Sequence, residues 1–218
     1  MEESRKVGRP TNKTDARVRL ITHARDLFMV MAYDKVSIRL IAQKAGVNSS
    51  LIRYYFGNKE GLFETMLRET LAPMFERMSV LLESSSTESF LDLMRTYYRE
   101  MNKLPQFPRL IAQVMYMPPS QTQRRLMEKV FKDVKTPMQG ALAQKLTDSG
   151  ILRPDMDPKL CRLSYISLMV FPFIAPPAML YMHDIELNEE FLSELLEHNI
   201  KLMSHGFLAV EQGYINEN

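Results

Sequence analysis

The sequence predicts an all-α protein with an N-terminal helix-turn-helix domain and a larger C-terminal helical domain. Apolar residues recur at the three- and four-residue spacing of helical faces. Glycine is scarce, at 8 of 218 residues, and no convincing alternating β-branched run occurs. The content of 45% apolar and 25% charged residues is that of an ordinary globular chain.

Charge is distributed unequally along the chain. The net charge is +2, but residues 1–60 hold 12 Lys and Arg against 6 Asp and Glu, whereas residues 61–218 hold 16 against 20. A basic module ahead of a larger acidic one indicates a polyanionic partner for the first module only. Charge alone fits an ordinary solvated surface equally well, so the pattern of residues has to decide.

Membrane-spanning, secreted and disulfide-linked classes are not expected. No apolar run approaches the roughly 18 residues of a membrane span, and no apolar segment follows the charged N-terminus MEESRKVGRP. The single cysteine, Cys161, excludes an intrachain disulfide. We therefore expect a cytoplasmic protein without a membrane partner.

The first helix is expected to start at a cap on Thr14 or Asp15 and to end near Ala32. Its expected inward face consists of Val18, Ile21, Ala24, Leu27, Phe28 and Met31. Ser37 caps a short second helix, and Gly46 ends it because glycine readily takes the left-handed conformation just past a helix end. The expected inward residues of this second helix are Ile38, Ile41, Ala42 and Ala45.

A third helix is expected after Asn48, with Ile52 and Phe56 inward, and a fourth begins near Lys59. Two short helices joined by a tight glycine turn form a helix-turn-helix, whose second helix fits the major groove of DNA. Residues 35–59 contain five basic side chains and no acidic one. This composition favours DNA binding over a generic three-helix bundle.

The stretch from Arg17 to Leu67 resembles the DNA-binding domain of TetR-family transcriptional regulators, above all in VSIRLIAQKAGVNSSLIRYYFGNKEGLFETML. The family's turn stands here as IAQKAGV and its closing pattern as YYFGNKEGLF. The resemblance covers about a quarter of the chain, and beyond Leu67 only helical character and length agree. Ala32 is a departure, because family members usually carry Gly there, so a small change in that turn is expected.

These observations divide the chain into a basic arm at 1–13, a helix-turn-helix DNA-binding domain at 14–58, and a helical effector-binding and dimerisation domain at 59–218. Within the arm, Arg9 lies in a Gly-Arg-Pro sequence, the core of an extended minor-groove hook. A basic tail held by Coulomb attraction alone is the alternative and the slightly preferred interpretation.

Ten residues are expected to contact double-stranded DNA. Ser37 can bind a phosphate at its helix start or act as a simple cap. Arg53 can read a guanine with two hydrogen bonds, or contact a phosphate instead. For Lys59 the resemblance implies a contact to backbone phosphate. The expected set is Arg9, Ser37, Arg39, Lys44, Ser49, Ser50, Arg53, Tyr54, Tyr55 and Lys59.

The remaining members of this set have open roles. Arg39 and Lys44 can bind phosphates, although Lys44 is as readily a solvated surface lysine. Ser49 and Ser50 are expected to read bases weakly because their side chains are short. Tyr54 and Tyr55 can contact a phosphate or a thymine methyl group, or one of them packs on the first helix.

A dimer is expected because one helix-turn-helix contacts too few base pairs for genomic selectivity. The last long helix, expected at 188–210, carries an apolar stripe wider than one core-facing side requires. With the helix expected at 158–170 it can form a four-helix bundle across a two-fold axis, as in TetR-like proteins. A helix buried within the monomer is the alternative.

Prolines are expected to divide the C-terminal domain into about five or six helices. Breaks are expected at Pro105, Pro108, Pro118, Pro119, Pro154 and Pro158, and a break or kink at Pro172, Pro176 and Pro177.

A small-molecule effector site in this domain is implied by the family resemblance. Met and aromatic side chains suit a pocket for apolar ligands, although a single Met at helical spacing is more often plain core. Guesses at the lining are Met66, Met74, Tyr97, Met101, Val114, Phe131 and Tyr165. No cofactor or metal site is expected, and no catalytic grouping, so an enzyme is not predicted.

The sequence thus predicts a homodimeric repressor that binds a palindromic operator and is released by a small, largely apolar effector. Repression is preferred because a dimer covering a promoter blocks polymerase without needing an activation contact. The alternative is a DNA-binding regulator that activates, or that acts through protein partners without an effector.

Overall fold

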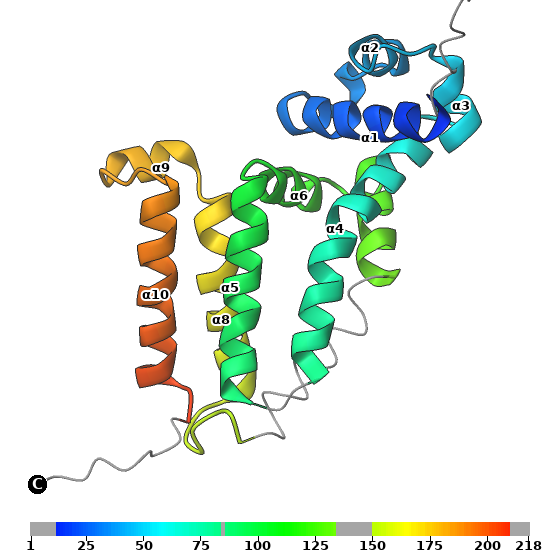
Figure 1. The fold of residues 1–218 in the computed structure, drawn as a ribbon. Coiled ribbons are helices and arrows are strands. Elements are labelled where there is room, and N and C mark those ends of the chain that lie inside the picture. Colours follow the sequence, from blue (N-terminus) through cyan, green and yellow to red (C-terminus); the bar gives the residue numbers. More distant parts are fainter. Residues whose placement is uncertain (1–11, 84–85, 134–149, 210–218) are drawn as a thin grey trace, which may run out of the picture. The chain divides into compact units, whose positions relative to one another are not determined.

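The computed structural model describes residues 12–83, 86–133 and 150–209 (Figure 1). Within these ranges the regular structure is helical apart from one isolated antiparallel bridge between Leu152 and Leu208, so the predicted all-α class is confirmed. None of the described helices is both long and apolar enough to cross a membrane.

The chain divides into two compact units. The first holds the described residues up to Thr70 together with Pro118–Met127, and the second holds Leu71–Met117 and the described residues from Glu128 onward. Two helices pass from one unit into the other along the chain: α4 (Lys59–Glu83) and a helix over residues 122–133.

The first unit is built around α1 (Asn12–Val30). The short 3-10 helix η1 (Tyr33–Lys35) follows, then α2 (Ile38–Lys44) and α3 (Ser50–Phe56). Helix α1 packs against both α2 and α3, and the two short helices lie beside it in Figure 1.

Side-chain caps and a glycine turn define α2 and α3. The hydroxyl oxygen of Ser37 accepts a hydrogen bond from the backbone N–H of Leu40 at 3.1 Å. The side-chain oxygen of Asn48 accepts one from the backbone N–H of Ser50 at 2.8 Å. Between the helices, Gly46 has a φ of 64°, which places it in the left-handed region. The predicted Ser37 cap and Gly46 turn are confirmed. At α3 the N-cap residue is Ser49, whose side chain forms no capping bond, and Asn48, one residue earlier, supplies the side-chain acceptor.

The stripe that α1 buries agrees only in part with the expected one: Ile21, Ala24 and Phe28 are buried as predicted. Val18 is 52% exposed and Met31 is also exposed, so their placement on the inward face is wrong. Leu20 is fully buried instead, because the face against α2 and α3 is a row of residues four apart, and Val18 lies on nearly the opposite side. The buried residues of α1 are Ala16, Leu20, Ile21, Ala24 and Phe28.

The inward placement of Ile38 is also wrong. Ile38 occupies the first position of α2 and is exposed, whereas Val36, two residues before it, is fully buried. Ser37 between them is the extended cap residue, so the chain turns here from an extended segment into a helix. The inward face predicted from helical spacing therefore does not include the first residue of the helix.

The turn after α1 does not require glycine. Ala32 has φ −57° and ψ 140°, an extended conformation open to any residue. The next residue, Tyr33, stacks its ring on Phe28 with centroids 5.4 Å apart and meets the edge of Phe63 at 5.2 Å. This aromatic group holds the turn, which explains how Ala32 is accommodated.

The second unit contains the end of α4 and five further labelled helices. Helix α5 packs against α8 and α10, and α6 packs against α8, as Figure 1 shows. Their bounds are α5 (Thr87–Lys103), α6 (Phe107–Tyr116), α8 (Pro158–Ile174), α9 (Pro177–Met182) and α10 (Glu189–Gly206).

Most of the predicted proline breaks occur. Helix α5 ends before Pro105, Pro108 lies in the first turn of α6, and Pro158 opens α8. At Pro172 the expected break does not occur, because α8 continues to Ile174.

A buried polar cluster accounts for the proline inside α8. Pro172 has no N–H to donate to the carbonyl of Leu168, four residues before it. That carbonyl instead accepts hydrogen bonds from the Tyr98 hydroxyl at 2.9 Å and from the Asn199 side-chain amide at 3.3 Å. Asn199 also donates to the Tyr98 oxygen at 3.0 Å. The cluster therefore joins α5, α8 and α10.

Tyr98 is a neutral donor in this cluster. Burial raises the pKa of its hydroxyl to about 12, although the hydrogen bond from Asn199 acts in the opposite direction. The hydroxyl therefore keeps its proton for Leu168 at physiological pH.

Removal of the Asn199 amide is expected to destabilise the second unit. We expect Asn199→Ala to lower the free energy of unfolding by about 1–3 kcal/mol, because it removes hydrogen bonds to two buried acceptors. Chemical denaturation of the purified protein measures this change, and Glu197→Ala, at an exposed position of the same helix, is the control. Equal denaturation midpoints for the two variants would contradict the role of the cluster.

Candidate nucleic-acid interface

Helix α3 has one buried and one exposed face. Ile52 is fully buried, whereas Ser50, Arg53 and Tyr54 are exposed and share one face at the i, i+3, i+4 spacing. Tyr54 is 69% exposed, and its ring meets that of Tyr55 edge-on at 4.9 Å. A short helix with a polar, basic and aromatic outer face is suited to lie in a major groove.

Basic side chains around α3 are not neutralised within the first unit. The side chains of Arg39, Lys44 and Arg53 are exposed and form no ion pair with any described residue. On the other helices of this unit, by contrast, Arg17 pairs with Glu69 and Arg68 with Glu64. Uncompensated positive charge is therefore present on α2 and α3, where it attracts an anionic partner.

Arg17 helps to orient α3. Its guanidinium lies 5.7 Å from the ring centroid of Phe56, at the end of α3, and also pairs with Glu69 of α4. One side chain of α1 thus contacts both helices that meet at Gly57, where φ is 77°. These contacts connect the exposed face of α3 to the core of the unit.

Lys59 is engaged inside the first unit. Its ammonium donates a hydrogen bond to the carbonyl of Tyr33 and lies 4.0 Å from the centroid of the Tyr33 ring. Burial lowers the pKa of Lys59, although the charge of Asp34 acts in the opposite direction. Burial, together with the charges of Glu60 and Asp34, raises the pKa of Tyr33 to about 12. A phosphate contact by this ammonium would compete with these interactions.

Lys59→Ala is expected to act on stability as well as on DNA. We expect it to lower the free energy of unfolding by about 1–2 kcal/mol, because a hydrogen bond and a cation–π contact between η1 and α4 are lost. Thermal unfolding measures this loss. Lys44→Ala, at an exposed position without an internal partner, is expected to leave the melting temperature unchanged. The same melting temperature for both variants would rule out the internal role of Lys59.

The other expected DNA contacts are placed unevenly. Ser37 caps α2, Ser49 is half-buried before α3, and Tyr55 is half-buried. Arg9 lies outside the described residues. Most of the expected set thus lies on α2, on α3 or directly before them, and Lys59, at the start of α4, contacts Tyr33.

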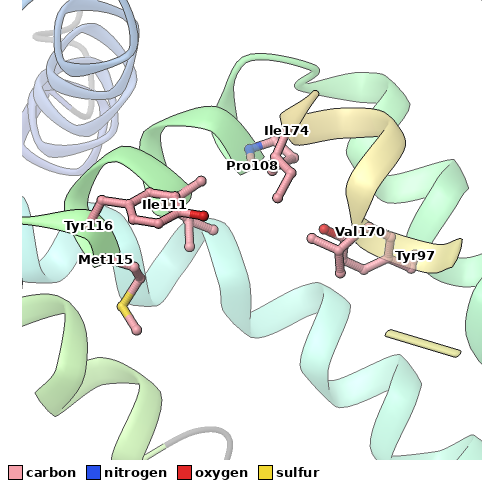
Figure 2. Close-up of a pocket in the computed structure, with 8 residues that line it drawn as sticks. Tyr97, Pro108, Ile111, Met115, Tyr116, Val170 and Ile174 are labelled. Carbon is pink, nitrogen blue, oxygen red and sulfur yellow. The ribbon is translucent and has the colours of Figure 1, made fainter. Parts of the chain in front are cut away.

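A second candidate site is a pocket in the second unit, with a volume of about 270 Å³ (Figure 2). Side chains of α5, α6 and α8 form it. The lining residues are Tyr97, Pro108, Ile111, Ala112, Met115, Tyr116, Val170 and Ile174.

Of the seven residues guessed for an effector site, Tyr97 lines this pocket. Tyr165 is fully buried and donates its hydroxyl to the carbonyl of Phe90 at 3.0 Å. Phe131 meets Phe75 with ring centroids 6.5 Å apart. The other guessed residues are buried and absent from this lining: Met66, Met74, Met101 and Val114.

Sequence reasoning chose one residue of α6, the buried Val114, but missed the five residues of this helix that are among the eight lining the pocket. Its Ile111, Met115 and Tyr116 follow helical spacing and leave Met115 and Tyr116 exposed. Large apolar residues on a short helix are a weak signal, because the partner of that helix is not evident from the sequence.

Comparison with known proteins identifies the first unit. Residues 20–66 match the family described as bacterial regulatory proteins, tetR family. None of the curated proteins matches the chain.

The similarity to solved structures extends over both units. NalD of Pseudomonas aeruginosa, the secondary repressor of the MexAB-OprM multidrug efflux pump, is 20% identical with a TM-score of 0.67, covering 90% of this chain and 98% of its own. FadR of Bacillus subtilis, in complex with stearoyl-CoA, is 18% identical with a TM-score of 0.65, covering 87% and 98%. The ketosteroid regulator KstR2 of Mycobacterium tuberculosis is 17% identical with a TM-score of 0.66, covering 94% and 100%.

The family match lies on the helices that form the exposed basic face, and the similar structures share the fold of the whole chain. The resemblance noted from the sequence is therefore confirmed: residues 20–66 match the tetR family of bacterial regulatory proteins, and the chain shares its fold with solved structures of regulators of that family.

Proposed function

We propose that the protein is a homodimeric, sequence-specific DNA-binding repressor that leaves its operator when a small, largely apolar effector binds. The exposed face of α3 carries this proposal: Arg53 lies beside Ser50 and Tyr54, forms no ion pair with a residue that the structure describes, and stands in a segment, 35–59, that has no acidic residue. Its guanidinium is free to form two hydrogen bonds to one guanine. Such a regulator acts in the cytoplasm, where the chromosome lies.

An apolar stripe on α8 supports the dimer. Leu160, Leu163 and Phe171 are exposed at positions that follow one helical face, whereas Tyr165 and Met169 on the other side are buried. Large apolar side chains exposed in a row on a long helix are typical of a protein interface.

Helix α10 has a corresponding stripe. Leu202 is exposed and Leu195 is half-buried, while Leu192, Asn199 and Met203 are buried against the rest of the unit. A second copy that packs its α8 and α10 on these stripes buries both, in a two-fold arrangement that also presents two α3 helices to DNA.

The pocket supports effector binding, and continuous helices support its coupling to DNA. Helix α4 and the helix over 122–133 each have residues in both units, and in this proposal the effector acts by shifting one of these helices. An effector that favours the DNA-free arrangement by about 1–3 kcal/mol is enough for a typical coupling. The similar FadR structure contains stearoyl-CoA, an apolar chain on a polar head.

Selection of bound fragments from genomic DNA tests this proposal. We expect a palindromic site with half-site centres roughly 34 Å or a multiple of it apart. Promoter-containing templates then distinguish repression from activation in a purified transcription assay. Failure to select any specific site would contradict sequence-specific regulation and favour action through protein partners.

A further inference from the structure

None of the described residues that line the pocket of the second unit is charged. Six of its side chains are apolar and the other two are tyrosines. Arg109, the basic residue of α6, is not among the lining residues. A charged ligand group inside this pocket would lose its hydration without gaining an opposite charge, which is strongly unfavourable.

The hydroxyl of Tyr97 has no hydrogen-bond partner among the described residues. Its side chain is 9% exposed, and its hydroxyl forms no hydrogen bond with any of the described residues. Burial, with a smaller contribution from Tyr98, raises the pKa of this hydroxyl well above its usual value. The group is therefore a neutral hydrogen-bond donor at physiological pH.

The direction of Tyr97 is set by its packing. Its ring meets the edge of Phe173 on α8 with centroids 5.7 Å apart. Figure 2 shows the hydroxyls of Tyr97 and Tyr116 on the inner ends of their rings, facing the space between the labelled side chains. Tyr116 is mostly exposed, so the hydroxyl of Tyr97 is the deeper of the two.

We propose that this pocket selects an uncharged effector, whose apolar body lies among Ile111, Ala112 and Val170 and whose single polar atom accepts a hydrogen bond from Tyr97. An apolar cavity of about 150 Å³ holds one benzene molecule, and the volume of this pocket, about 270 Å³, is less than twice that. The group held inside is therefore small, about nine or ten non-hydrogen atoms. This inference rests on the proposed function, in which the second unit binds an effector.

Three probes of matched length test the charge preference: 1-octanol, octanoate and octylammonium. Their binding to the full-length protein is measured by isothermal titration calorimetry at pH 7 in the absence of DNA. We expect 1-octanol to bind at least about tenfold more tightly than either ion, because only the ions lose hydration without compensation. Equal or tighter binding of octanoate or octylammonium would overturn the proposal.

Two variants test the location. Tyr97→Phe removes only the hydroxyl and is expected to weaken 1-octanol binding about three- to tenfold, the value of one hydrogen bond. Ala112→Phe fills the pocket and is expected to abolish binding, whereas Ala178→Phe, at an exposed position of α9, leaves it unchanged. Wild-type affinity in Tyr97→Phe overturns the proposal even if Ala112→Phe fails to fold.

The failure of this inference is distinguishable from that of the proposed function. The binding assay contains no DNA, so it reports on the pocket alone. Selective 1-octanol binding that depends on Tyr97 supports the inference even if no operator is selected, and in that case the regulatory function fails. If an operator is selected but the three probes bind equally well, the regulatory function is supported and this inference fails.

Discussion

Leu163→Arg is expected to convert the dimer into a monomer and to lower the affinity for a palindromic DNA site by about a hundredfold or more. Leu163 is 64% exposed in the middle of the apolar stripe on α8. An arginine there places a charge in an apolar interface, and the two-fold symmetry places a second one there from the other subunit. A monomer contacts one half-site and loses the base contacts of the other, each worth about 1–3 kcal/mol per base pair.

Sedimentation velocity and fluorescence anisotropy with labelled operator DNA measure the two effects together. Val80→Arg introduces the same side chain at an exposed apolar position of α4, outside the stripes of α8 and α10, and is the matched control. We expect this control to stay dimeric and to bind like the wild type. A dimeric Leu163→Arg protein would remove α8 from the proposed interface.

Arg53→Ala is expected to cost about 1–3 kcal/mol at the preferred sequence, a five- to 150-fold loss, and to relax selectivity at one base pair. Arg53 is exposed on α3 and shares the outer face of the helix with Ser50 and Tyr54, whereas Ile52 is buried. Its loss should therefore remove base contacts without disturbing the core. Binding to a panel of single-base variants of the operator, at one fixed salt concentration, measures the effect.

Lys44→Ala gives the contrasting pattern. A phosphate contact carries no sequence information, so its loss should weaken binding to all sequences alike and reduce the salt slope by about one. If Arg53→Ala also weakens every sequence equally, Arg53 positions the helix and does not read a base.

Local chemistry made the helix-turn-helix predictable from the sequence. The caps at Ser37 and Asn48, the left-handed Gly46 and the prolines that bound α6 and α8 each act within a few residues of their own position. Such features depend on backbone geometry that neighbouring residues determine. The basic segment at 35–59 likewise needs no knowledge of the fold, because its charge excess is a property of composition.

Features that join distant segments were not predictable. The stripe buried by α1 depends on the helices packed against it, which is why Leu20 replaced Val18 in the core. The contact between the ammonium of Lys59 and the carbonyl and ring of Tyr33, 26 positions away, was not predicted, whereas the phosphate contact of Lys59 stays a prediction.

The same limit applies to the second unit. Tyr98 meets Leu168 and Asn199 across 70 and 101 positions, and the pocket combines α6 with side chains of α5 and α8. Helical periodicity shows which residues of one helix share a face, but the partner of that face depends on how several helices pack at once. The sequence therefore specified the DNA-binding motif and the helices, while the packing of those helices specified the polar cluster, the place of Lys59 and the pocket.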